Sequence, residues 1–290
     1  MSASPSLPPF SASLSSLSLT SFSTVVTRLR AAGCVFAEEE AHMLLSAART
    51  PDDLAAMVDR RVGGLPLEHV VGWAEFHGLR IALDPGVFVP RRRTEFLVRQ
   101  AASRVRPGAV VVDLGCGSGA LGAAVAASQE GVELHAADID PAAVRCARRN
   151  VAAIGGRVYE GDLYEPLPTA LRGRIDILLA NMPYVPTDEI ELLPAEARVH
   201  EARMALDGGA DGLDVLRRVA AEAVLWLAPG GHLLVETTER QAPAASEVFA
   251  RYGLTPRVAT SEELYATVVI GTRPVGLSDG RGEHEGSCAR

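Results

Sequence analysis

The stretch VVVDLGCGSGA, residues 110–120, decides the fold class of this chain. Its β-branched beginning predicts a strand, and Gly115, Gly117 and Gly119 follow that strand directly. Glycine lets the backbone turn tightly and approach a ligand with no side chain in the way. We therefore predict a strand, a glycine-rich loop and then a helix.

An acidic residue ends the next predicted strand. Asp138 stands 19 positions after Gly119, in the run HAADIDP. A carboxylate at this place can accept hydrogen bonds from both ribose hydroxyls of a nucleotide. The loop and the acid together indicate a cofactor that contains a nucleoside, although a plain strand–helix turn also uses glycines.

Strands and helices alternate through the middle and end of the chain. Strands are predicted at 109–113, 132–137, 174–180, 231–237 and 265–271. Helical segments separate them, for example 141–153 and 212–227. Such alternation is typical of a mostly parallel sheet covered by helices on both faces, so the predicted fold class is α/β.

The chain divides into five predicted segments. Residues 1–21 are rich in Ser, Pro and Leu, and we expect a disordered leader. Residues 22–66 have apolar residues at helical spacing and predict a small helical domain. Residues 67–89 predict a β-hairpin linker. Residues 90–272 form the predicted α/β domain, and 273–290, rich in Gly, Ser and charge, a disordered tail.

Composition and charge narrow the classes of function. The chain has 290 residues and a net charge of −8, which argues against a broad electrostatic grip on nucleic acid. No apolar run is long enough to span a bilayer. The four cysteines form no CxxC pair and no metal-ligand spacing with histidine. We therefore expect reduced thiols, no metal site and a cytoplasmic location.

A second stretch, ILLANMPYVP at 177–186, marks the expected reactive end of the site. An apolar strand stops at Asn181, and Met182, Pro183 and Tyr184 follow. In an open parallel sheet, ligands bind beyond the carboxyl ends of the strands. These four residues are therefore expected beside the cofactor.

The string DLGCGSG resembles motif I of class I S-adenosylmethionine methyltransferases, and it fits the dinucleotide fingerprint only loosely. The resemblance implies a Rossmann-like, seven-stranded sheet and S-adenosyl-L-methionine as the cofactor. It implies cofactor contacts from Asp113, Gly115, Cys116, Gly117, Ser118, Gly119, Asp138, Asp162, Leu163 and Asn181.

The same resemblance implies a role for each acid. In that family the loop lies against the amino-acid part of the cofactor, and the acid at the position of Asp113 helps to hold it. Asp138 is then the ribose ligand. Asp162 matches the position of an acid near the adenine amino group, but a turn-forming aspartate beside Gly161 explains it equally well.

The string NMPY resembles the (Asn/Asp)-Pro-Pro-(Tyr/Phe) signature of methyltransferases that act on planar nitrogen. An amide nitrogen is a poor nucleophile because its lone pair is delocalised into the carbonyl. Two acceptors, Asn181 Oδ1 and the Met182 carbonyl, would hold its hydrogens, and the ring of Tyr184 would stack on the planar group. Pro183 biases Met182 toward an extended conformation. These four are the predicted catalytic residues.

A longer resemblance, over residues 25–272, is to the release-factor, or protein-(glutamine-N5), methyltransferases. Its motifs are GLPLEHVVG at 64–72, AEFHGL at 74–79, PGVFVPR at 85–91, RVHE at 198–201 and ALDGG at 205–209. The resemblance implies methylation of a glutamine side-chain amide in a protein, such as the Gly-Gly-Gln loop of a release factor. It also implies that the helical domain at 22–66 recognises the substrate.

Three departures from the family pattern stand out. Arg92 and Arg93 replace a proline and an acid, Met182 replaces the first proline of the signature, and Thr237-Thr238 follow Glu236 where the family has Ile or Leu and then Gly. The combination resembles a side branch of unassigned substrate. The arginines either meet an acidic or phosphate-bearing partner or form a solvated helix start.

Other classes of function share parts of the pattern. A nucleic-acid amino-methyltransferase, acting on an adenine or guanine exocyclic amine, would use the same Asn-x-Pro-Tyr chemistry, but such enzymes usually have a basic docking face. A nicotinamide-dependent oxidoreductase would need a proton donor, for which we find no candidate. A non-catalytic module that keeps only the fold is the third alternative. We expect a protein substrate, no membrane and no strong nucleic-acid binding.

Overall fold

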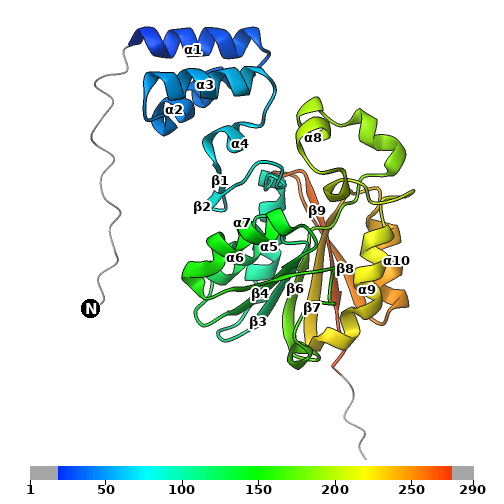
Figure 1. Cartoon of the computed structure of the whole chain (residues 1–290). Coiled ribbons are helices and arrows are strands. Elements are labelled where there is room, and N and C mark those ends of the chain that lie inside the picture. Colours follow the sequence, from blue (N-terminus) through cyan, green and yellow to red (C-terminus); the bar gives the residue numbers. More distant parts are fainter. Residues whose placement is uncertain (1–18, 276–290) are drawn as a thin grey trace, which may run out of the picture.

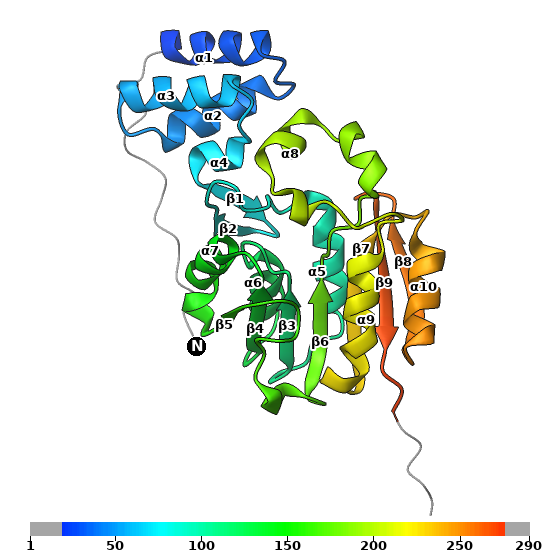
Figure 2. The same cartoon turned by 45° about the vertical axis from the view of Figure 1, so that its right-hand side comes forward.

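The structure, a computed structural model, describes residues 19–275 (Figure 1). Residues 1–18 and 276–290, which hold most of the predicted leader and tail, lie outside the described residues. Within the described part, a group of helices leads through a two-stranded hairpin into a seven-stranded sheet with helices on both faces (Figures 1 and 2). No helix in this part is both long and apolar enough to cross a membrane.

The sheet has the strand order β5-β4-β3-β6-β7-β9-β8. Only β9 is antiparallel to its neighbours, so the predicted α/β class with a mostly parallel sheet is confirmed. The bounds are β3 Val110–Leu114, β4 Glu133–Asp138, β5 Arg157–Glu160, β6 Ile175–Ala180, β7 Leu227–Thr237, β8 Thr255–Ser261 and β9 Ala266–Thr272. The two edge strands, β5 and β8, had no predicted range because each carries few buried residues.

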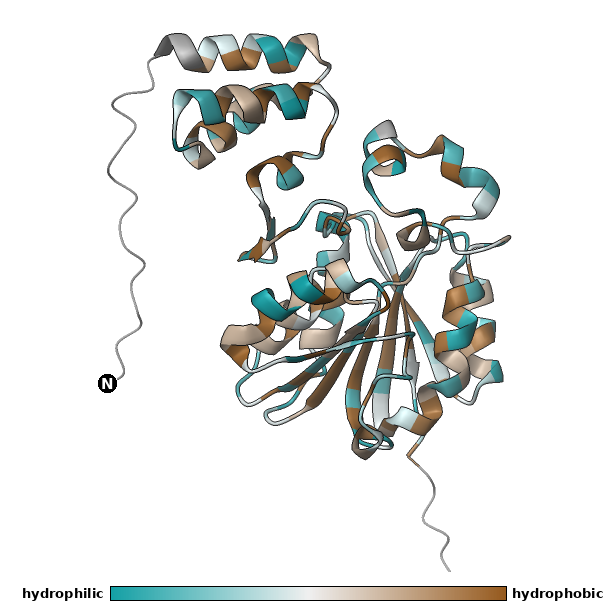
Figure 3. Ribbon diagram, in the orientation of Figure 1, coloured by the Kyte–Doolittle hydropathy of each residue, from teal (hydrophilic) through white to brown (hydrophobic). Residues whose placement is uncertain are grey.

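Helices cover both faces of the sheet and bury two apolar cores (Figure 3). One face packs against α5 Glu95–Ala102, α6 Ala120–Ala127 and α7 Pro141–Val151. The other face packs against α9 Asp214–Trp226 and α10 Ala242–Arg251. The sheet order reverses between β3 and β6, and a ligand crevice is expected at such a point.

The N-terminal helices form a third apolar core. They are α1 Leu19–Ala31, α2 Ala37–Ala47 and α3 Pro51–Val62. Helix α3 begins where it does because Thr50 Oγ1 accepts a hydrogen bond from the Asp53 amide at 3.1 Å, with Pro51 in the first turn. Arg61 near its end makes a largely buried ion pair with Glu40 of α2, with Nε and Oε2 2.6 Å apart.

The hairpin is shorter than the predicted interval of 67–89. Residues 67–71 form helix α4 instead, and Gly72, in the left-handed conformation, ends it. Strands β1 Trp73–Phe76 and β2 Leu79–Ala82 follow. The side-chain amide of Asn150 on α7 donates to the carbonyl of Ala82 and accepts from its N–H, both at 2.9 Å, so the hairpin is fixed to the α/β part.

The remaining elements are short. They are the single turn α8 Ala195–His200 and the 3-10 turns η1 Arg92–Thr94, η2 Ala152–Ile154, η3 Thr169–Leu171, η4 Thr187–Leu192 and η5 Arg203–Ala205. Three of them, η4, α8 and η5, follow one another between β6 and α9 and form a lobe above the carboxyl ends of the strands (Figure 2).

A buried carboxylate ties β3 to α6. Asp113 is 1% exposed, and its Oδ2 accepts a hydrogen bond from the Gly122 amide at 2.9 Å. Burial raises the pKa of Asp113 from its ordinary value of 3.8 to about 7, although the Gly122 hydrogen bond acts in the opposite direction. The carboxyl group therefore gains its proton at a much higher pH in the folded chain than in the unfolded chain.

Replacing Asp113 with asparagine should flatten the dependence of stability on pH. Between about pH 4 and pH 7 the folded chain holds a proton that the unfolded chain releases, so the unfolding free energy should fall as pH rises, by roughly 1.4 kcal/mol per pH unit. Asparagine keeps an acceptor for Gly122 but does not titrate. Urea unfolding of wild type and Asp113→Asn across this range measures the difference.

The matched control is Asp188→Asn, because Asp188 is exposed on η4. This variant should keep the wild-type pH dependence. If Asp113→Asn keeps it as well, Asp113 is ionised throughout the range and its burial does not govern the profile.

Candidate functional site

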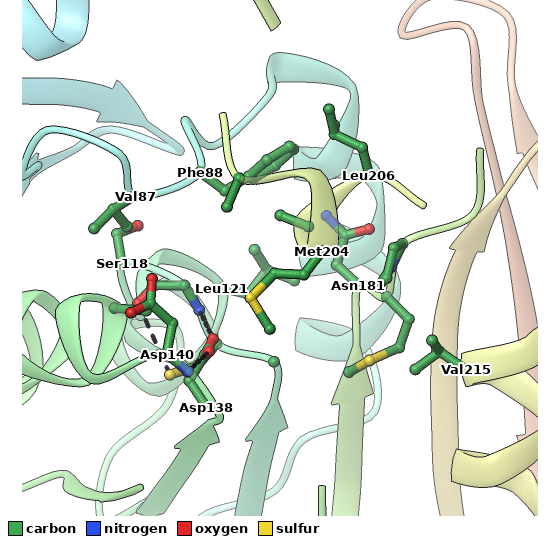
Figure 4. Close-up of a pocket in the computed structure, with 18 of the residues that line it drawn as sticks. Val87, Phe88, Ser118, Leu121, Asp138, Asp140, Asn181, Met204, Leu206 and Val215 are labelled. Atoms are coloured by element: carbon green, nitrogen blue, oxygen red, sulfur yellow. Dashed lines mark hydrogen bonds between the residues drawn. The ribbon is translucent and has the colours of Figure 1, made fainter. Parts of the chain in front are cut away.

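A cavity of about 280 Å³ lies at the carboxyl ends of β3, β4 and β6 (Figure 4). Every predicted site residue except Gly119 lines it. In Figure 4, Ser118, Asp138 and Asp140 lie on one side of the cavity, and Asn181 and Val215 on the other. The sequence therefore identified the part of the wall at the strand ends, while the contributions from residues 86–94 and 202–206 were not predicted as site residues.

Gly119, the one predicted site residue that does not line the cavity, has a structural role. It adopts the left-handed conformation immediately before α6, with a φ of 77°. A Cβ atom on it would lie 3.1 Å from the Cβ of Ala147 and 3.3 Å from Val151 on α7. Gly119 lets α6 pack closely against α7, and its contact with the cofactor stays a prediction.

The rest of the glycine loop is held by backbone amides and the acid after β4. Gly115 and Gly117 have φ values of 60° and 55°, which favour glycine. The Gly117 amide donates to Asp138 Oδ2 at 2.8 Å, and the Asp140 amide donates to Oδ1 at 2.9 Å. Burial raises the pKa of Asp138. Each carboxylate oxygen can accept a further hydrogen bond, so Asp138 remains able to bind a diol.

Cys116 and Ser118 line the cavity, but neither side chain has a reactive role in the site. The Cys116 side chain is buried, and burial raises the pKa of its thiol well above the usual value, so it is no nucleophile. The carbonyl of Ser118 accepts from Asn150 Nδ2 at 2.8 Å. Asn150, which also binds Ala82, therefore connects the hairpin, α7 and the glycine loop. No sequence pattern indicated this role, because Ala82 and Ser118 are 68 and 32 positions away from Asn150 in the chain.

The turn after β5 forms another wall. Asp162 and Leu163 line the cavity, and Leu163 has a left-handed φ of 48°. Asp162 Oδ2 pairs with Arg218 Nη2 of α9 at 2.6 Å. Its carbonyl also accepts from the Glu165 amide at 3.0 Å, which closes the turn. Asp162 is thus both a turn residue and a wall residue, and Arg218 is a wall residue that the sequence did not indicate.

Asn181 stands directly after β6 with its side chain in the cavity (Figure 4). Within residues 19–275, its side-chain amide has no hydrogen-bond partner, so both its donor and its acceptor are available to a ligand. Met182 is buried against the glycine loop. A Cβ atom on Gly115 would lie 2.8 Å from Met182 Cε, so Gly115 and Met182 fit together as a pair.

The phenol of Tyr184 belongs to a charged network. Its hydroxyl accepts from Arg93 Nη2 at 2.6 Å and donates to Glu236 Oε1 at 2.9 Å. Arg93 Nε also donates to Glu236 Oε1 at 3.0 Å. Burial and the neighbouring Glu236 raise the pKa of Tyr184, so the phenol stays protonated at neutral pH.

Arg91, Arg92 and Arg93 differ in their surroundings: two of them form ion pairs within the described part of the chain, and Arg92 is exposed. Arg91 pairs with Glu201, whose pKa is raised by burial. Arg93 pairs with Glu236. Among the residues that the structure describes, Arg92 alone of the three has no charged partner, and it is exposed. Of the two arginines that depart from the family pattern, Arg93 is therefore paired inside the described part of the molecule, whereas Arg92 is not.

The groups that line the cavity come from the ends of several strands. They include a left-handed glycine loop, an acid with free acceptor capacity, an unpaired amide and an aromatic ring, all at one edge of the sheet. No histidine lines the cavity, and the part of the chain described by the structure holds no group of His, Cys, Asp and Glu fit for a metal ion. The arrangement suits the holding and orientation of two planar or polar ligands.

Comparison with known proteins agrees with this inventory. The family model described as "Methyltransferase small domain" matches residues 78–220. The release factor glutamine methyltransferase of Geobacter sulfurreducens is 39% identical over 208 residues, which cover 70% of this chain and 72% of that protein. The one of Gloeobacter violaceus is 39% identical over 207 residues, with 69% and 71% covered.

The solved structures agree on the fold. A methyltransferase from Pyrococcus furiosus superposes with a TM-score of 0.54 at 18% identity, covering 75% of this chain and all of that one. The predicted class I fold, the cofactor S-adenosyl-L-methionine and the family resemblance are thus confirmed, despite the departures at Arg92, Arg93 and Met182. This chain belongs to the release factor glutamine methyltransferase family of S-adenosyl-L-methionine-dependent enzymes.

Proposed function

We propose that this chain methylates the side-chain amide nitrogen of the glutamine in the Gly-Gly-Gln loop of a peptide-chain release factor. The observation that carries the proposal is the unpaired amide of Asn181, which faces the cavity beside the glycine loop and three positions before Tyr184. Family membership supports the choice of substrate.

The residues around the glycine loop fit the cofactor. Gly115 and Gly117 present backbone without a Cβ atom, and no atom lies within 4 Å of the place where a Cβ on Gly117 would be. Asp138 would accept from the ribose hydroxyls, and the wall formed by Asp162 and Leu163 would border the base. When bound, S-adenosyl-L-methionine supplies a methyl group on a positively charged sulfur, which is already activated for transfer.

The chain's task is then to orient a weak nucleophile. Asn181 Oδ1 and the carbonyl of Met182 would accept the two hydrogens of the substrate amide and fix its plane. The ring of Tyr184 would lie against that plane. The phenol keeps its proton, so Tyr184 acts in this scheme as a surface and not as a base.

The helices around the cavity suggest where a protein substrate would rest. Arg61 of α3 contacts Glu196 of α8, with Nη1 and Oε1 2.9 Å apart, so the helical unit and the lobe above the cavity touch. We propose that residues 22–66 recognise the substrate and that its loop reaches the cavity beside this lobe. A release factor as substrate also implies action in the cytoplasm.

Asn181→Ala should abolish most of the transfer while leaving the cofactor site intact. The purified protein is incubated with methyl-labelled S-adenosyl-L-methionine and a release factor from the same source, and the label is mapped by mass spectrometry. The wild type should label the glutamine of the Gly-Gly-Gln loop. Loss of one oriented acceptor should lower kcat by roughly 10²-fold, with cofactor affinity changed only a few-fold.

Two results would contradict the proposal. One is an unmodified release factor in a reaction where a related enzyme of known activity labels it. The other is label that appears in RNA or DNA from the same cells and not in the release factor, which would favour an exocyclic amine as the target.

Asp138→Asn should weaken the cofactor and leave the protein folded. The change removes the negative charge of the acceptor. It also places the asparagine Nδ2 donor against the N–H of Gly117 or Asp140, where two donors face each other. The Kd for S-adenosyl-L-methionine, measured by calorimetry, should rise roughly 10- to 100-fold. Asp188→Asn, outside the cavity, serves as the control, and an equal Kd in both variants would remove Asp138 from the cofactor site.

A further inference from the structure

We propose that Arg93 is a positioning residue for the reaction, which it serves by holding the ring of Tyr184 through the phenol. This inference rests on the proposed function. Arg93 lies on η1, Tyr184 follows β6 and Glu236 lies on β7, so three separate elements meet at one hydroxyl group. Arg93 stands where the family pattern has an acid, and an acid could not make this network.

The hydroxyl of Tyr184 is fully engaged. It accepts from Arg93 Nη2 at 2.6 Å and donates to Glu236 Oε1 at 2.9 Å, so its single proton has one defined direction. The backbone of the same residue is held as well, because its carbonyl accepts from Gln241 Nε2 at 2.9 Å. With both ends of Tyr184 fixed, its ring has one orientation at the cavity wall.

Burial makes Arg93 necessary to this arrangement. The side chain of Glu236 is 3% exposed, whereas that of Arg93 is 51% exposed. A carboxylate so deeply buried needs a counter-charge, and its Oε2 atom has no partner at all within residues 19–275. Arg93 and Tyr184 both bind the other oxygen. Without the guanidinium, Glu236 would lose the only cation that pairs with it in the described part of the chain, and the phenol would lose one of its two partners.

A second contact acts on the ring itself. The guanidinium carbon of Arg93 lies 5.7 Å from the centroid of the Tyr184 ring, within the range of cation–π attraction. Arg93 thus restrains the ring at its hydroxyl and from beside its face. Because a small misplacement of a positioning group can cost a large factor in rate, this restraint should affect kcat more than binding.

The test compares neighbouring arginines. Arg93→Met removes the charge and the donors at similar length, Arg93→Lys restores the charge, and Arg92→Met is the matched control on the same turn. Methylation of the release factor should show kcat reduced roughly 10-fold or more in Arg93→Met, with the Kd for S-adenosyl-L-methionine within about two-fold of wild type. Arg93→Lys should recover part of the rate, and Arg92→Met should retain it.

A double-mutant cycle separates positioning from a general loss of structure. If Arg93 acts mainly through the phenol, Tyr184→Phe already removes its main contact, so the loss of kcat in the double variant should be clearly smaller than the product of the two single losses. A loss of kcat in the double variant equal to the product of the two single losses would overturn the proposal. So would an Arg93→Met rate equal to that of Arg92→Met.

A measurement of stability, which does not depend on methylation, distinguishes the proposed role of Arg93 from the proposed function. The same cycle of Arg93→Met and Tyr184→Phe, measured on the urea unfolding midpoint, should show that the two losses are not additive. If the wild type fails to methylate the release factor but this coupling is present, the proposed function fails and the contact stands. Additive losses in unfolding would reject the contact itself, whatever the substrate. If Arg93→Met does not fold, Arg93→Gln takes its place in both cycles.

Discussion

The site depends on one constraint, a left-handed glycine loop held in place by one buried and one half-buried carboxylate. Asp113 binds the amide of Gly122 behind the loop, and Asp138 binds the amide of Gly117 at its front. Both acids lose hydration by burial, which raises the pKa of each, and the backbone hydrogen bonds offset part of that cost. The cavity, its open floor at Gly117 and the start of α6 all follow from this arrangement.

Two ion pairs stand at the mouth of the cavity. Arg91 pairs with Glu201 below the lobe, and Arg93 pairs with Glu236 at the end of β7. The departure at Arg93 thus has an internal partner, and at the mouth of the cavity Arg91 and Arg93 are each paired with an acid. A neutral amide fits such a mouth better than a phosphate, which agrees with a glutamine as the target.

The sequence predicted the α/β class, five of the strands and the part of the cavity wall that stands at the strand ends, because these features are local. A glycine loop after a β-branched run, and an acid or amide at a strand end, can be found by spacing alone. The hairpin interval was too long because Val70 and Val71 belong to α4, and an apolar pair fits a helix or a strand equally well. The packing of Gly119 against α7 was not predicted, because α7 is a separate element whose position depends on the tertiary structure.

By itself, then, the sequence determined which residues end the parallel strands and so which must gather at one edge of the sheet. Only the tertiary structure decided which charged groups meet there. Arg93 and Glu236 are 143 positions apart, and Asp162 and Arg218 are 56 apart. The physical reason is that such pairs are set by strand order and by the packing of separate elements, and no local periodicity carries that information.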